Sequence, residues 1–164
     1  MKSALPRILI VFLLCSHVAS GADETLPMVD GWPGVLILSG GSAVPDEAAT
    51  ALKDAIKTGG SLVLITEAAS DPSTVAKSVK WLKEHEFSDY VTIDSALSES
   101  ERRTKTIAAI DAASAVWIGG GQQAKLAKSF EDGSVESALQ RLLLRGGTVG
   151  GTSAGAAIMS KVMI

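Results

Sequence analysis

The stretch that decides the fold is GTVGGTSAG, residues 147–155, in which a short apolar run leads into a serine between glycines. The apolar start predicts a β-strand, and the G-x-S-x-G pattern over residues 151–155 is that of a nucleophile elbow. In such an elbow the serine occupies a sharp strand-to-helix turn, and the flanking glycines leave room for the tight backbone. The sequence therefore predicts that Ser153 projects from the end of a sheet and that a helix begins beside it.

Apolar runs recur at intervals ahead of this elbow. Including the run that enters the elbow, they cover residues 35–38, 62–65, 91–93, 115–118 and 148–149. Because these runs are apolar throughout instead of alternating with polar residues, they are typical of central strands in a parallel sheet that is covered on both faces.

The segments between the runs carry helix signals. A proline-led acidic start at residues 45–47 precedes a glycine stop at 59–60, and Asp71 followed by proline opens the next segment. Ser98 and Glu101 have the spacing of a capping box. The alternation predicts an α/β fold, a doubly wound and mostly parallel sheet with flanking helices, whose ligands bind beyond the carboxyl ends of the strands.

The N-terminus has the pattern of a secretory signal. Basic residues precede a short apolar run at residues 8–14, and small residues follow at 19–22. We therefore expect a signal peptide over residues 1–22, a linker or entry loop over 23–33, and the domain over 34–164. This arrangement predicts a secreted or periplasmic protein with no stable membrane insertion after cleavage. A membrane anchor is the alternative, although the apolar run is short for a bilayer.

Composition excludes several classes of function. The formal net charge of −3 gives no basic footprint for nucleic acid. Cys15, the only cysteine, lies in the predicted signal peptide, so the mature chain has no disulfide, thiol nucleophile or thiolate metal site. His, Asp and Glu show no ligand spacing, and we expect no metal and no cofactor. The oligomeric state is left open, with a homodimer as one option.

A second glycine-rich loop supports the elbow. Three glycines at residues 119–121 follow the apolar run at 115–118, and their backbone N–H groups can form half of an oxyanion hole. The amide of Ala154 would supply the other half. A phosphate-binding loop and a plain tight turn are the alternatives for the glycines, but the chain lacks the Gly-Lys-Ser/Thr and G-x-G-x-x-G patterns of nucleotide sites.

Two motifs together resemble a known family. GTSAGAA at residues 151–157, with glycines at 146 and 147 before it, and VWIGGGQ at 116–122 resemble the cyanophycinase branch of the serine peptidases related to dipeptidase E. The resemblance covers the chain from about Gly34 to its end. It implies a fold similar to class I glutamine amidotransferases, with serine in place of their cysteine.

The resemblance also implies an activity and a site. The activity is hydrolysis of peptides with aspartyl groups, either α-aspartyl dipeptides or the β-linked aspartate-arginine polymer cyanophycin. In the site, Ser153 would be the nucleophile, Gly120 and Gly121 would line the oxyanion hole with Ala154, and Gln122 would lie in the substrate pocket. Gln122 has a second interpretation, as a solvated residue at the start of a helix.

The chain departs from the family pattern in its catalytic base. In the family a histidine and an acid follow the serine, whereas this chain ends at Ile164 before either, so we expect a C-terminally incomplete domain. His85, the only histidine beyond the predicted signal peptide, lies at a charged helix end where a solvated or capping role is ordinary. Glu67, at a predicted strand end, is either a better-placed acid or a loop residue facing water.

Other side chains have simpler predicted roles. Arg102 and Arg103 are expected on a solvated helix face, although an anion site is the alternative. Trp81 and Trp117 are expected in the core.

Two other functions stay open. One is an α/β-hydrolase esterase, which would be expected to carry an HGGG-type loop early in its sheet. The other is a non-catalytic protein that keeps the pocket without the base.

Overall fold

The computed structural model describes residues 33–41, 43–93 and 95–160. Strands and helices alternate along the chain as the sequence predicts, with two helices before the last strand. The elements are β1 (Val35–Ser39), α1 (Asp46–Ile56), β2 (Leu62–Ile65), α2 (Pro72–Glu84), β3 (Tyr90–Thr92), α3 (Glu99–Ala112), β4 (Ala115–Ile118), α4 (Gln123–Phe130), α5 (Ser134–Leu144), β5 (Thr148–Thr152) and α6 (Ala154–Ala157).

The five strands form one sheet in the order β1-β5-β4-β2-β3, and every pair of neighbours is parallel. All four residues of β2 and all four of β4 are buried, which explains their uninterrupted apolar sequences. Parallel neighbours must be joined by crossover connections, and the helices between the strands provide them. The α/β prediction with flanking helices is confirmed.

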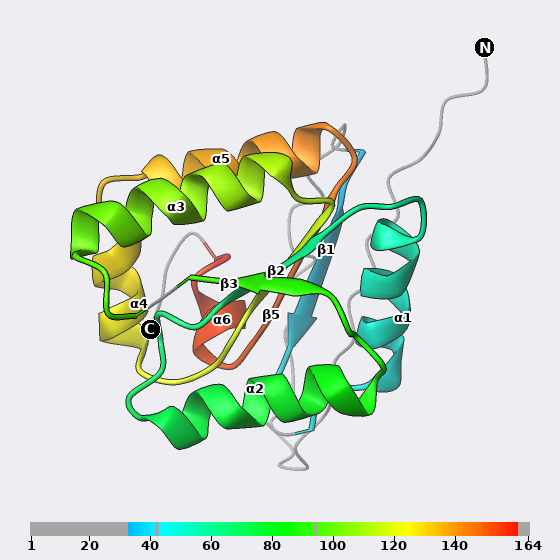
Figure 1. Cartoon of the computed structure of the whole chain (residues 1–164), viewed down its shortest axis with the longest axis horizontal. Coiled ribbons are helices and arrows are strands. Elements are labelled where there is room, and N and C mark those ends of the chain that lie inside the picture. Colours follow the sequence, from blue (N-terminus) through cyan, green and yellow to red (C-terminus); the bar gives the residue numbers. More distant parts are fainter. Residues whose placement is uncertain (1–32, 42, 94, 161–164) are drawn as a thin grey trace, which may run out of the picture.

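Helices cover both faces of the sheet (Figure 1). One apolar core lies between the sheet and helices α1 and α2, and its fully buried members include Leu52, Leu82 and Trp117. The other lies under α3, α4 and α5 and includes Ile110 and Leu126. Alternate residues of β2 and β4 point into opposite cores, so the sheet separates two layers of helices and the fold is doubly wound.

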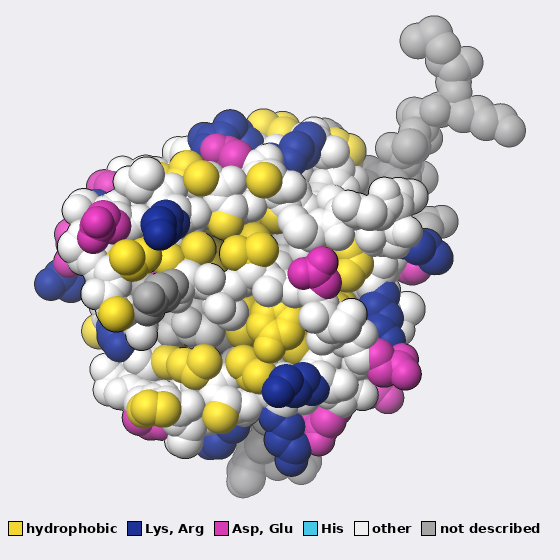
Figure 2. Space-filling view, viewed as in Figure 1, with side chains coloured by type: hydrophobic (Ala, Val, Ile, Leu, Met, Phe, Trp, Pro, Cys, Tyr) yellow, Lys and Arg dark blue, Asp and Glu magenta, His cyan; other side chains and the backbone are white. Residues whose placement is uncertain are grey.

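Two strands differ from the sequence prediction of covered central strands. β1 and β3 lie at the two edges of this five-stranded sheet, and β3, which forms from the run at residues 91–93, has only three residues. Val91 is 41% exposed, and Figure 2 shows hydrophobic side chains on the face where β3 lies in Figure 1. All three residues of β3 are intermediate or exposed, so the apolar character of this run does not reflect burial on both faces.

The predicted helix starts are present. Ser98 and Glu101 form a capping box at α3, and the carboxylate of Asp71 accepts hydrogen bonds from the backbone N–H groups of Ser73 and Thr74 at α2. The hydroxyls of Ser73 and Ser70 also donate to this carboxylate, and they, followed by the backbone N–H of Thr74, hold the pKa of Asp71 well below its usual value. The caps satisfy amides that lack partners in the first turn of a helix, and they fix where each helix begins.

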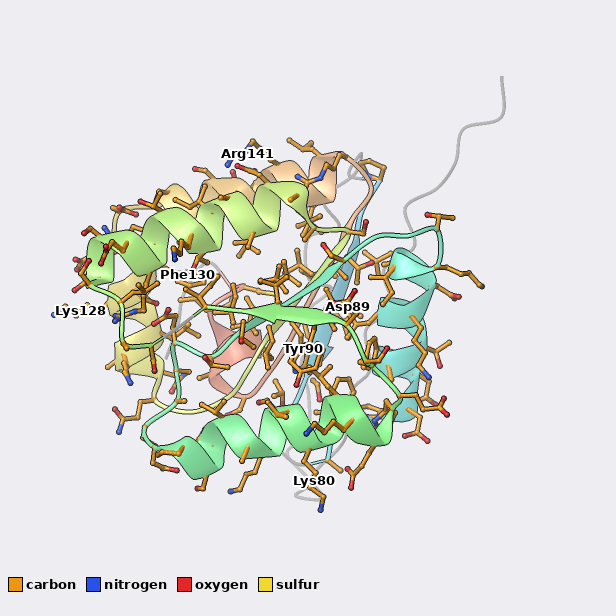
Figure 3. The ribbon with its side chains drawn as sticks, in the orientation of Figure 1. Lys80, Asp89, Tyr90, Lys128, Phe130 and Arg141 are labelled. Carbon is orange, nitrogen blue, oxygen red and sulfur yellow. The ribbon has the colours of Figure 1, made fainter. Side chains whose placement is uncertain are left out.

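The two helices on the second face are tied to each other at the surface. Arg141 of α5, at the upper edge of Figure 3, donates to both carboxylate oxygens of Asp111 on α3, at 3.0 and 2.9 Å. This bidentate pair keeps the pKa of Asp111 below its usual value, first through the hydrogen bond to Arg141.

The predicted signal peptide, and all of the predicted linker except residue 33, lie outside the described residues.

Candidate active site

Ser153 occupies a strained turn between β5 and α6. Its backbone has φ 52° and ψ −120°, and residues with a Cβ rarely adopt a positive φ. The turn is held on both sides: the Ser153 N–H donates to the carbonyl of Ser39 at 3.1 Å, and the Ser153 carbonyl accepts from Ala156 and Ala157 at 2.9 Å. Ser153 is exposed. The structure therefore has the backbone of the predicted elbow, with its serine facing solvent.

The glycine after the serine lets the short helix touch the sheet. A Cβ on Gly155 would overlap the carbonyl oxygen of Ile118, the last residue of β4, and would also lie 2.9 Å from the carbonyl oxygen of Gly119. Both obstacles are backbone atoms that cannot rotate away. Glycine at this position thus lets α6 lie directly against the end of β4.

The glycine loop after β4 is fixed to the loop after β2. The Gly119 N–H donates to the carbonyl of Ile65 at 2.9 Å, and the Gln122 N–H donates to the carbonyl of Ala68 at 2.7 Å. Gly121 between them has φ 145°, and a Cβ there would overlap the Ala68 carbonyl. The loop can follow this path only with glycine at position 121.

The sheet order brings two loops beside Ser153. β5 lies between β1 and β4, so the loops that follow those strands flank the elbow. A Cβ on Gly120 would lie 3.1 Å from the Cβ and 3.8 Å from the Oγ of Ser153, and a Cβ on Gly41 would lie 3.5 Å from the same Oγ. Gly120 is thus adjacent to the serine, as predicted. Gly41, in the loop after β1, was not predicted as a site residue.

The predicted oxyanion groups are available for a ligand. Within residues 33–41, 43–93 and 95–160, the backbone N–H groups of Gly120, Gly121 and Ala154 donate no recorded hydrogen bond, and the same holds for the hydroxyl of Ser153. Ala154 is the first residue of α6 and is 2% exposed. Unpaired N–H groups near a nucleophile can bind a negatively charged oxygen, provided that their directions converge.

An open pocket of about 490 Å³ lies in front of the serine. The elbow and both glycine loops form one side of it, and a face of α2 forms another. Its lining residues are Gly41, Ala43, Val44, Thr74, Lys77, Ser78, Trp81, Trp117, Gly120, Gly121, Thr152 and Ser153. The four residues from α2 were not predicted as site residues, although their spacing of three, one and three positions is that of one helix face.

Gln122 and Glu67 lie elsewhere. Gln122 is exposed at the start of α4, makes no capping hydrogen bond and is not among the lining residues, so its role in substrate binding stays a prediction. Glu67 lines a separate cavity of about 20 Å³ and lies 3.6 Å from Arg102. It is therefore neither beside the serine nor freely solvated, because its side chain is only 20% exposed.

The two arginines at the start of α3 have partners in the fold. Arg102 donates to the carbonyl of Leu97 at 2.8 Å, and Arg103 pairs with Asp132 at 2.7 Å and with Glu99 at 3.1 Å. These contacts join α3 to the loops around it. The two arginine side chains are only 26% and 24% exposed, so the expected solvated helix face is wrong, and the pairings give no support to an anion site.

The two tryptophans differ in environment. Trp117 in β4 is 1% exposed, as expected for a core residue. Trp81 of α2 is only partly buried, and its ring stacks on that of Trp117 with 5.0 Å between the centroids. Both rings line the pocket, so a core assignment is incomplete for each of them.

His85 lies at the end of α2 and is not among the lining residues of the pocket. Its Nε2 is 3.0 Å from a carboxylate oxygen of Asp46, and its Nδ1 is 2.9 Å from the carbonyl of Trp81. Because both ring nitrogens face acceptors, the protonated ring satisfies both contacts, and the pKa of His85 is raised, first by the hydrogen bond to Asp46. The contact with the Trp81 carbonyl is the expected capping role, whereas the link to Asp46 of α1 was not predicted.

We expect this link to stabilise the fold at low pH. A raised pKa in the folded state gives stabilisation that is complete below about pH 6.5, the unfolded value, and is lost as pH rises through the folded value. Asp46→Asn should therefore lower the free energy of unfolding more at about pH 5.5 than at about pH 8.5, by less than about 1 kcal/mol because Asp46 is exposed.

Urea denaturation at the two pH values measures this difference. Asp54→Asn is the matched control, because Asp54 also lies on α1 but pairs with Lys57 and not with a histidine. The control should cost the same at both pH values. A cost of Asp46→Asn that does not depend on pH would show that His85 is not linked to folding through Asp46.

In the part of the chain that the structure describes, no group of three or more His, Cys, Asp or Glu side chains is placed to hold a metal ion. No helix in the same part of the chain is both long and apolar enough to cross a bilayer. The absence of a metal requirement therefore stays a prediction from the sequence.

A family comparison matches almost the whole described region. The model of peptidase family S51 matches residues 35–164, from the first strand through the elbow. The chain belongs to peptidase family S51. The S51 match includes the glycine loops and Ser153, and the resemblance to this group of serine peptidases is confirmed at the level of the family.

A solved structure shows the same fold. The crystal structure of a peptidase from an acI-B1 Actinobacterium matches 76% of this S51 chain with a TM-score of 0.55 and 19% sequence identity. At 19% identity, the similarity shows a common fold and nothing more specific. The match covers 55% of the length of that peptidase. None of the curated proteins searched matches the sequence.

Proposed function

We propose that this protein is a serine-type peptidase in which Ser153 is the nucleophile. The observation that carries the proposal is the backbone of Ser153, held at φ 52° on the turn after β5 with its side chain at an open pocket. A strained conformation persists only where the surrounding structure imposes it, and such positions are concentrated at functional sites. Membership of peptidase family S51 supports the same function.

The proposed reaction forms and then hydrolyses an ester. The Oγ of Ser153 attacks the peptide carbonyl carbon, its proton passes to a base and then to the leaving nitrogen, and the C–N bond breaks to leave an acyl-serine. Water then hydrolyses the ester and restores the hydroxyl. The N–H groups of Gly120, Gly121 and Ala154 would stabilise the oxyanion that forms in both steps. The residues that line the pocket include no histidine and no carboxylate, so we assign no base.

The proposed substrates are peptides with aspartyl groups, either α-aspartyl dipeptides or cyanophycin. The GTSAGAA and VWIGGGQ motifs support this class, because both resemble the cyanophycinase branch. Export through the segment 1–22 is part of the same proposal. An exported peptidase would act on material outside the cytoplasm, such as peptides or polymer released from other cells.

A substrate panel tests the proposal. The purified full chain is incubated with an α-aspartyl dipeptide, with cyanophycin, with the corresponding alanyl dipeptide and with p-nitrophenyl acetate, and released amines or phenolate are quantified. Hydrolysis confined to one or both aspartyl substrates supports the proposed class. Turnover of the ester alone would favour an esterase, and binding without turnover would favour a non-catalytic protein.

A further inference from the structure

The wall of the pocket formed by α2 is unusually polar. Thr74, Lys77, Ser78 and Trp81 line the pocket together with Ser153. Their spacing places them on one face of the helix, and three of the four carry polar groups. A helix face that packs toward a sheet normally carries apolar residues, so polar residues there suggest a ligand instead of packing.

This wall has a fixed position relative to the elbow. A Cβ on Gly119 would lie 3.1 Å from the Oγ of Ser78, which places α2 against the start of the glycine loop. One turn further along, the stacked rings of Trp81 and Trp117 join α2 to β4. These two contacts hold α2 beside the strand whose end carries the glycine loop.

Lys77 is the only ionisable residue among those that line the pocket. Within the part of the chain that the structure describes, its ammonium group has no recorded hydrogen bond or ion pair. An unpaired positive charge at a pocket favours a negatively charged ligand.

We propose that Lys77 binds a carboxylate group of the substrate and so determines specificity. The proposal rests on the proposed peptidase function and adds the chemistry of the substrate group that lies against α2. The hydroxyls of Thr74 and Ser78, which line the same wall, are further donors for the carboxylate oxygens. An ammonium pairs with a carboxylate through a charge-assisted hydrogen bond, which is stronger than a bond between neutral groups.

Lys77→Met tests the assignment in the full chain with three substrates: aspartyl-leucine, asparaginyl-leucine and the C-terminal amide of aspartyl-leucine. For the substrate that presents the bound carboxylate, KM should rise by about tenfold to a hundredfold, with a smaller change in kcat. The substrate in which that carboxylate is neutral should lose far less. The two neutralised substrates distinguish the side-chain carboxylate from the terminal one.

Two further variants control the result. Lys77→Arg keeps the charge and should restore much of the affinity, whereas loss of packing would not be restored by charge. Lys80→Met is the matched control, because Lys80 lies on the same helix, pairs with Glu84 and points away from the molecule at the lower edge of Figure 3. Equal losses for all three substrates, or equal losses in the variants at positions 77 and 80, would overturn the proposal.

A binding measurement separates this proposal from the peptidase function. Calorimetric titration of Ser153→Ala with N-acetyl-aspartate and with N-acetyl-asparagine does not depend on turnover. Tighter binding of N-acetyl-aspartate that is lost in the Ser153→Ala, Lys77→Met double variant supports the carboxylate site even if no substrate is hydrolysed. Equal affinity for the two compounds would point to the α-carboxylate that both carry, whereas affinities for both compounds that the double variant leaves unchanged would contradict the site even if the enzyme is active.

Discussion

Replacing Ser153 by alanine should abolish hydrolysis of an aspartyl dipeptide. The side chain is the proposed nucleophile, and its loss from serine hydrolases lowers kcat/KM by on the order of a thousandfold or more. Alanine keeps the Cβ and therefore the strained backbone at φ 52°. Because the residue is exposed, the free energy of unfolding should change by less than about 1 kcal/mol.

Initial rates and urea denaturation of the same preparations separate the two effects. Ser137→Ala is the matched control, because it removes an exposed serine hydroxyl of α5 that donates to the carbonyl of Gly133 and lies outside the pocket. We expect this control to retain most of the activity. Wild-type rates in Ser153→Ala would show that another residue performs the attack.

Gly155→Ala should destabilise the fold by about 3 kcal/mol, which is the upper range for overpacking. In the interior of a free helix the same change would stabilise by about 1 kcal/mol. Here the added methyl group would overlap the backbone of Ile118, and no side-chain rotation can relieve a contact with backbone atoms. The steric term therefore outweighs helix propensity, and α6 must move away from β4.

Urea denaturation measures this loss, and Gly40→Ala is the matched control. A Cβ on Gly40 would have no heavy atom within 4 Å, so the control should change the free energy of unfolding by less than about 0.5 kcal/mol. Because α6 begins beside Ser153, moving the helix should also displace the elbow, and the Gly155 variant should therefore lose activity as well. A variant that is as stable as the wild type would contradict the close contact between α6 and β4.

Local sequence patterns were sufficient for most of the fold. The apolar runs of β2 and β4 are buried on both faces, and the capping box at Ser98 and the proline at the start of α2 mark where helices begin. The strand run at 91–93 was assigned correctly as a strand and wrongly as a covered one. Whether a strand lies at an edge depends on the strand order, which short apolar runs do not specify.

The elbow could be predicted because its constraints are local. The pattern at residues 151–155 contains both the strained serine and the glycine that contacts the sheet. The neighbours of Ser153 could be predicted only in part. Gly120 belongs to a recognisable motif, whereas Gly41 reaches the serine because β5 lies between β1 and β4, an order that follows from the tertiary fold.

The environments of charged side chains were the least predictable. Glu67 follows β2 at the end of the sheet where the site lies, but its side chain lies near Arg102 and outside the pocket. Lys77 belongs to a helix of which the sequence predicted only the start, yet it lines the pocket. The direction of a side chain depends on how its element rotates against its neighbours, and this rotation is fixed by packing across the whole domain.

Mass spectrometry of the acyl intermediate tests the role of Ser153 most directly. The full chain is mixed with an aspartyl p-nitroanilide, quenched in acid over a series of times and digested. We expect an aspartyl group on the peptide that contains Ser153, and none in the Ser153→Ala variant. An aspartyl group on any other residue, or hydrolysis with no acylated Ser153 at any quench time, would contradict the assignment.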